Sequence, residues 1–108
     1  MNSIFIRRSI RRFEDRPVEP EKIERLLRAA MQAPSGMNTQ PWEFIVVQDP
    51  EKRLAISQMS EYAGMCRYAP CLIITLANMD YTAEHGSWWV QDMAACTQNI
   101  LLQAVEEG

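Results

Sequence analysis

The sequence predicts a small α+β domain in which helices pack on a sheet and one long helix is buried. Two apolar, β-branched segments, residues 42–47 (WEFIVV) and 71–77 (CLIITLA), have the composition and length of strands. From Ser87 onward a long segment is apolar on nearly every side, which is typical of a helix inside a structure. With 108 residues, 47% of them apolar and 23% charged, a single globular domain is expected.

Helical patterns precede the first strand. Residues 2–8 predict a short helix with Ile4 and Phe5 on its apolar side. Pro20 suits the first turn of a second helix. This helix should run to about Gln32, because its apolar residues recur at helical spacing: Ile23, Leu26, Leu27, Ala30 and Met31.

A third helix is expected at residues 49–59, with looser connections at 61–70 and 78–86. These elements do not make a self-sufficient domain, because a two-stranded sheet is unstable alone and a long apolar helix needs more surrounding structure. The last helix also ends on AVEEG, where acidic residues oppose its dipole and Gly108 has the character of a helix-ending residue. We therefore expect residues 1–108 to form one domain without its C-terminal part, completed by a missing segment and by a partner chain.

The net charge of −3 conceals a basic N-terminus: five arginines fall within residues 7–16, and no Lys or Arg follows Arg67. This cluster indicates an anionic partner, and it is too small for general nucleic-acid affinity. No apolar run reaches eighteen residues, so no membrane-spanning helix is expected. The single histidine, His85, leaves little room for histidine-based catalysis. The cysteines lack metal-binding spacing, which indicates free thiols in a reducing cytoplasm and no metal site: Cys66, Cys71 and Cys96.

The first candidate motif is RRSIRRF at residues 7–13, which brings together Arg7, Arg8, Ser9 and Arg11 near a helix end. Guanidinium groups are planar, always charged and suited to phosphate, and a serine hydroxyl adds another donor. The alternative is a solvated basic turn whose arginines pair with nearby acidic residues, since runs of charge are usually solvated faces.

The second candidate motif is APSGMNTQPW at residues 33–42, whose small and amide residues are Pro34, Ser35, Gly36, Asn38 and Gln40. Side-chain amides both donate and accept hydrogen bonds, which suits the edge of a heteroaromatic ring. The alternative is an ordinary helix-to-strand loop in which proline and glycine only end the helix and start the strand.

Taken in order, the two motifs resemble those of the nitroreductase family, with the pattern R-R-S-I-R-x-F followed after one helix by A-P-S-x-x-N-x-Q-P-W-x-F. The resemblance extends through YAPCLIITLA and DMAACTQNILLQA, and so covers nearly the whole chain. It implies a mixed sheet packed by helices around a long central helix. It also implies a homodimeric flavoprotein with FMN at the interface, which moves a hydride from NAD(P)H to a nitroaromatic, quinone or similar acceptor by ping-pong turnover.

The same resemblance implies a role for each candidate residue. The FMN phosphate would be held by three side chains: Arg7, Arg8 and Ser9. Arg11 would reach the ribityl chain and the pyrimidine edge, where its charge would stabilise the anionic reduced flavin. The loop of the other subunit would pack along the isoalloxazine ring through four residues: Pro34, Ser35, Gly36 and Asn38. Gln40 would support that loop, and no side chain is assigned a catalytic role because the flavin carries the redox chemistry.

Two other functions remain open from the sequence. A flavin-binding module without turnover, for storage or sensing, would share both motifs. A nucleic-acid binder using RRSIRR is disfavoured by the acidic overall charge.

Elsewhere, Trp88 and Trp89 are expected in the core rather than in a substrate pocket. Asp92 and Asn99 share one helix face and are expected to satisfy buried polar groups, and residues 62–68 are a candidate lid.

Overall fold

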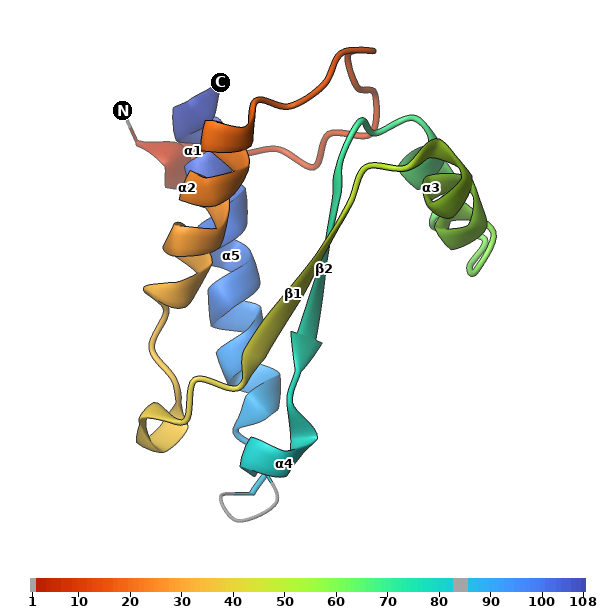
Figure 1. Cartoon of the computed structure of the whole chain (residues 1–108). Helices are drawn as coiled ribbons and strands as arrows, with labels where there is room; N and C mark the ends of the chain where they lie inside the picture. Colours follow the sequence, from red (N-terminus) through yellow and green to blue (C-terminus); the bar gives the residue numbers. More distant parts are fainter. Residues whose placement is uncertain (1, 83–85) are drawn as a thin grey trace.

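A computed structural model describes residues 2–82 and 86–108, in which helices pack beside a two-stranded sheet (Figure 1). The α-helices are α1 (Ser3–Ile6), α2 (Pro20–Met31), α3 (Pro50–Ser57), α4 (Met79–Thr82) and α5 (Trp89–Glu107). The strands are β1 (Trp42–Val47) and β2 (Leu72–Ala77), and the 3-10 helices are η1 (Gly36–Asn38) and η2 (Gly64–Arg67). The predicted α+β class is confirmed.

The two strands lie where the sequence predicts them and pair antiparallel, from Trp42 opposite Ala77 to Val47 opposite Leu72. The N–H of Asn78 extends the ladder by donating to the carbonyl of Pro41 at 2.7 Å. The connection between the strands carries α3 and η2, which project from the body of the molecule (Figure 1). Within the described residues the sheet is purely antiparallel, so a mixed sheet stays a prediction.

The core lies where α2 and α5 run side by side next to the sheet (Figure 1). Its central residues are Ala30 of α2, Trp42 of β1 and Cys96 of α5, with exposed fractions of 0%, 9% and 0%. Because the first and last of these side chains are small, the two helices can approach each other closely. Of the apolar positions predicted for α2, Ala30 is buried in this core, Ile23, Leu26 and Leu27 are half-buried, and Met31 is 47% exposed.

The helix ends follow the expected local chemistry. Asp49 caps α3 by accepting a hydrogen bond from the N–H of Lys52 at 3.0 Å. At the end of α5, Glu107 accepts from the Nε of Arg25 on α2 at 2.8 Å, which offsets the unfavourable effect of an acidic residue on the helix dipole. Gly108 has a φ of 79°, in the left-handed region that favours glycine after a helix.

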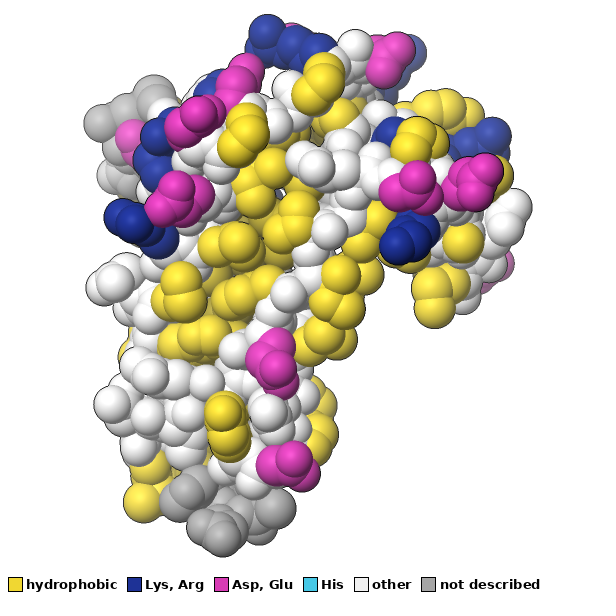
Figure 2. Space-filling model, in the orientation of Figure 1, with side chains coloured by type: hydrophobic (Ala, Val, Ile, Leu, Met, Phe, Trp, Pro, Cys, Tyr) yellow, Lys and Arg dark blue, Asp and Glu magenta, His cyan; other side chains and the backbone are white. Residues whose placement is uncertain are grey.

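The helix α5 is buried along one side only. Its buried residues are Asp92 and Cys96, whereas Val90 and Leu101 are 53% and 42% exposed. Hydrophobic side chains gather across the middle of the face shown in Figure 2, over the region between α2 and the strands. Within the described residues, α5 is thus buried on the side that contacts α2 and the strands, and its other side is exposed. None of the described helices is long and apolar enough to cross a membrane.

Three expectations differ from the structure in detail. The first helix is only four residues long, and its Ile4 and Phe5 are 66% and 75% exposed, because so short a helix has little face to bury. Part of the predicted loop 78–86 forms α4, since Asn78 Oδ1 accepts from the N–H of Asp80 at 3.0 Å and so stabilises a helical turn. Residues 83–85 of that loop lie outside the described residues. Trp88 is 54% exposed rather than in the core.

Candidate functional site

The basic segment follows α1 as irregular chain. Arg8 Nη1 donates to the carbonyls of Phe5 and Arg7 at 2.9 and 2.8 Å, and Arg11 Nη1 donates to the carbonyl of Ser9 at 3.3 Å. Among the described residues, none of the three arginines at 7, 8 and 11 forms an ion pair with a carboxylate. The backbone therefore orients Arg8 and Arg11 without neutralising their charges.

The alternative reading of this segment, a basic turn paired with its own acidic residues, holds in one place. Arg16 Nε lies 2.6 Å from the carboxylate of Glu14. Arg7 is half-buried, while Arg8, Ser9 and Arg11 are exposed. Positive charge thus remains available at the first part of the motif, where the sequence predicts a phosphate site.

The second motif folds into a tight loop with an unusual backbone. Met37, Asn38 and Gln40 have φ values of 54°, 57° and 50°, in the left-handed region that side-chain-bearing residues rarely adopt. Ser35 holds this conformation at both ends, because its carbonyl accepts from the N–H of Asn38 and its Oγ from the N–H of Gln40, each at 3.0 Å. Each such backbone conformation costs on the order of 1–3 kcal/mol, and such strain is concentrated at binding sites.

The loop rests on the first turns of α5. The N–H of Gly36 donates to Asp92 Oδ1 at 2.9 Å. Trp88 lies directly against Gly36, since a Cβ added to Gly36 would stand 2.8 Å from Trp88 Cβ. Further along the same helix, Asn99 Nδ2 donates to the carbonyl of Ala29 at 2.9 Å. Asp92 and Asn99 thus each satisfy one half-buried backbone group, as expected, while Asp92 Oδ2 has no partner among the described residues.

The two motifs lie toward opposite ends of α5 (Figure 1). The loop is bonded to Asp92 near the start of the helix, whereas α1, which leads into the arginines, contacts the end of the helix through the Ser3 hydroxyl and the Glu106 carboxylate. At about 1.5 Å per helical residue, these two attachment points are about 21 Å apart. Within one chain, α1 and the loop are therefore attached to well-separated points of α5.

Comparison with known proteins identifies the family to which a chain with these two motifs belongs. The sequence profile of the nitroreductase family matches residues 4–66, a span that contains both motifs. The chain belongs to the nitroreductase family.

Relatives of this nitroreductase-family chain are longer than it is. It is 42% identical to an Archaeoglobus fulgidus protein provisionally named as an NADH dehydrogenase/NAD(P)H nitroreductase, over 96% of this chain and 60% of the relative. The crystal structure of a Clostridium acetobutylicum protein provisionally named as an NADH oxidase matches with a TM-score of 0.93 and 50% identity, over 97% and 63% of the two chains. An FMN-dependent nitroreductase from Clostridium difficile matches with a TM-score of 0.85 and 38% identity, over 94% and 58%. The chain spans about three fifths of the length of these proteins.

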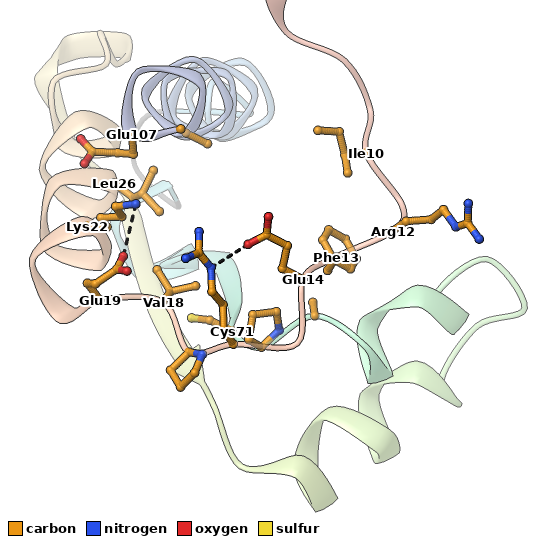
Figure 3. Close-up of a pocket in the computed structure, with 16 residues that line it drawn as sticks. Ile10, Arg12, Phe13, Glu14, Val18, Glu19, Lys22, Leu26, Cys71 and Glu107 are labelled. Atoms are coloured by element: carbon orange, nitrogen blue, oxygen red, sulfur yellow. Dashed lines mark ion pairs between the residues drawn. The ribbon is translucent and has the colours of Figure 1, made fainter.

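None of the nine predicted site residues of this nitroreductase-family chain lines either of two surface pockets. The pocket in Figure 3, of about 460 Å³, lies between the segment before α2 and the end of α5. Two of its cations are already paired, Arg16 with Glu14 at 2.6 Å and Lys22 with Glu19 at 3.3 Å, and Arg12 points away from the cavity (Figure 3). This pocket is therefore poorly suited to a phosphate group.

Two of the three thiols, those of Cys71 and Cys96, are unsuited to nucleophilic chemistry. The three cysteines are free, and Cys96 is buried in the core beneath β1. Burial raises the pKa of the Cys96 thiol, and it raises the pKa of the Cys71 thiol against the opposing effect of Arg53. Because a thiol must ionise to act as a nucleophile or a metal ligand, these two remain inert near neutral pH. In the part of the chain that the structure describes, no group of three or more His, Cys, Asp and Glu residues is placed to hold a metal ion.

Proposed function

We propose that the whole protein is an FMN-dependent oxidoreductase that takes a hydride from NADH or NADPH and passes it, by ping-pong turnover, to an electron-poor acceptor such as a nitroaromatic or a quinone. Membership of the nitroreductase family supports this proposal, as does similarity to an FMN-dependent nitroreductase and to a protein named for NAD(P)H nitroreductase activity. The observation that carries it is that one chain contains both arginines without a carboxylate partner and a loop with a left-handed backbone next to small side chains.

The N-terminal segment has the chemistry of a phosphate site. Arg7, Arg8 and Ser9 offer cationic and hydroxyl donors, and the arginines have no carboxylate partner among the described residues. Charge-assisted hydrogen bonds to a phosphate are about twice as strong as neutral ones. Arg11, two residues further, would lie beside the ribityl chain and pyrimidine edge, where a fixed positive charge favours the reduced, anionic ring.

The loop has the chemistry of a ring-binding wall. Pro34 and Asn38 are exposed, and Ser35 and Gly36 are half-buried, so these small or amide side chains are accessible at the surface of the loop. Gln40 supports the loop through its N–H, which donates to Ser35 Oγ. Bound FMN supplies the hydride-transfer chemistry, and the protein supplies binding, orientation and electrostatics.

The partner that completes the site is a second copy of the chain. The arginines and the loop are attached toward opposite ends of α5 in one chain, which supports a site that draws its arginines from one subunit and its loop from the other, as the family resemblance implies. We propose that FMN lies at this homodimer interface, with the loop of one subunit facing the flavin whose phosphate is held by the other. The free thiols suit a reducing compartment, and we place the protein in the cytoplasm.

Anaerobic stopped-flow spectroscopy on the purified whole protein tests the proposal. The protein should bind FMN, the flavin absorption should bleach on mixing with NADH or NADPH, and it should recover on adding a quinone or nitroaromatic. A protein that ignores added FMN would refute the function. A protein that binds FMN but is not reduced by either nicotinamide would instead be the alternative, a flavin-binding module for storage or sensing.

A further inference from the structure

Asp92 stands out in α5 because it is a carboxylate buried in an apolar helix. It is 5% exposed, and only one of its two oxygens has a partner among the described residues, since Oδ1 accepts from the N–H of Gly36 at 2.9 Å while Oδ2 is buried without one. Burial of a half-satisfied carboxylate is unfavourable for stability alone. Its place in the first turn of α5 favours a negative charge through the helix dipole, and its hydrogen bond to Gly36 also ties the helix to the loop.

The loop that Asp92 contacts is tied to α5 by this hydrogen bond. The other hydrogen bonds of residues 35–40 close the loop on itself, through the carbonyl and Oγ of Ser35 and the carbonyl of Gly36. Among the described residues, the bond to Asp92 is the one that fixes these six residues to another helix. The internal bonds thus set the shape of the loop, its flanks continue into α2 and β1, and Asp92 ties its middle to α5.

Trp88, one turn before Asp92, limits the loop from the same side. Its Cβ and Cγ would lie 2.8 and 2.9 Å from a Cβ at position 36. The loop is therefore pressed against α5 at Gly36, held by a hydrogen bond and stopped by the tryptophan. These two contacts together fix the distance between the loop and α5.

We propose that Asp92 is a positioning residue for the flavin, acting through Gly36 rather than by touching the cofactor. This inference rests on the proposed function, in which residues 34–38 form the wall along the isoalloxazine ring. A loop that is already fixed in position before the flavin binds loses little conformational entropy on binding. The flat ring can then contact the whole loop surface at a lower free-energy cost. Nothing in this role requires Oδ2 to have a partner.

Three variants test the role. Asp92→Ala removes the acceptor, Asp92→Asn keeps an acceptor oxygen for the Gly36 N–H, and Asn99→Ala removes a matched side-chain-to-backbone bond from the same helix without touching the loop. We expect Asp92→Ala to weaken FMN binding about tenfold, the effect of losing a hydrogen bond to a charged group. Asp92→Asn should stay within about threefold of the wild type, and Asn99→Ala should leave FMN affinity unchanged.

Hydrogen exchange on the flavin-free protein separates this inference from the proposed function. In Asp92→Ala, amides of residues 35–40 should exchange about tenfold faster, whereas in Asn99→Ala they should not. Unchanged exchange, unchanged FMN affinity, or equal losses in Asp92→Ala and Asn99→Ala would overturn the positioning role. If the wild type binds no FMN but loop exchange is faster in Asp92→Ala and unchanged in Asn99→Ala, the proposed function is wrong, whereas the anchoring of the loop by Asp92 is supported. Should Asp92→Ala be unstable, Asp92→Leu removes the acceptor while replacing a buried charge with apolar volume.

Discussion

Replacing Gly36 with alanine should destabilise the protein because of one contact. The new Cβ would lie 2.8 Å from Trp88 Cβ and 2.9 Å from Cγ, about 1 Å inside the optimum separation of carbon atoms. Both atoms belong to the rigid base of the tryptophan, so the loop or the start of α5 must move. Overpacking of this kind costs about 1–3 kcal/mol.

An opposing effect acts on the unfolded chain. Alanine restricts the unfolded backbone more than glycine does, which stabilises the folded state by about 0.4–1 kcal/mol where the native conformation permits alanine. Gly36 is not among the residues with positive φ, so this gain applies and only the clash opposes it. The expected net loss is about 1–2 kcal/mol, or roughly 4–16 °C in Tm for a domain of this size.

Thermal and urea unfolding of the flavin-free protein, followed by circular dichroism, measure the effect. In a Trp88→Gly background, Gly36→Ala should become stabilising, because both clashing atoms are absent. In a Trp88→Ala background the Cβ at 2.8 Å remains, so Gly36→Ala should still be partly destabilising. The matched control is Gly64→Ala, which meets nothing within 4 Å and should be stabilising. The reasoning would be refuted if Gly36→Ala changed the free energy of unfolding no more than Gly64→Ala does. It would also be refuted if Gly36→Ala were equally destabilising in the Trp88→Gly background.

Three further variants probe the two motifs and the end of α5. Ser35→Trp should abolish FMN binding, measured by flavin fluorescence, while leaving the circular dichroism spectrum unchanged; surviving affinity would contradict the assignment of the loop. The double variant Arg7→Ala/Arg8→Ala should weaken FMN binding at least tenfold but spare riboflavin, which has no phosphate, whereas equal losses for both ligands would argue against a phosphate site. The hydrogen bond from Arg25 holds the pKa of Glu107 below its ordinary value of about 4.5, so this pair stabilises the fold above that pH and ceases to do so as the pH falls through the lowered pKa. Arg25→Gln should therefore lower Tm at neutral pH, and its difference from the wild type should shrink in acid; a difference independent of pH would show that the ion pair is not its source.

The sequence was sufficient to predict the elements that have strong periodicity or composition. The spacing of apolar residues in α2, the β-branched run in β2 and the proline-initiated α3 lie close to where they were expected. The helix α4 was missed because one side chain, Asn78, decides between a loop and a helical turn. Which side of α5 is exposed was not predictable, because its apolar residues cover most of its circumference, although the need for further surrounding structure was.

The candidate site was predictable as residue types and not as geometry. The order of the two motifs identifies the family, which the match over residues 4–66 confirms. The left-handed backbone at Met37 and Gln40 carries no sequence signal, because neither residue favours it and bonds to Ser35 impose it. The contact of Gly36 with Trp88 joins residues 52 positions apart. Asp92 could have been singled out for the loop only by its charge within an apolar helix.

The separation of the motifs along α5 leads to a test of which subunit supplies each part of the site. Mixed dimers can be formed from one Arg7→Ala/Arg8→Ala chain and one Ser35→Trp chain. If each flavin draws its arginines from one subunit and its loop from the other, one site of the mixed dimer receives both intact parts and the other receives both defects. Such a dimer should bind one FMN with wild-type affinity. If both parts came from the same subunit, each site would carry one defect and neither would bind normally. Titration of FMN into isolated mixed dimers distinguishes the two arrangements, because a wild-type site can be regained from two defective chains only when α5 holds its two ends in different sites.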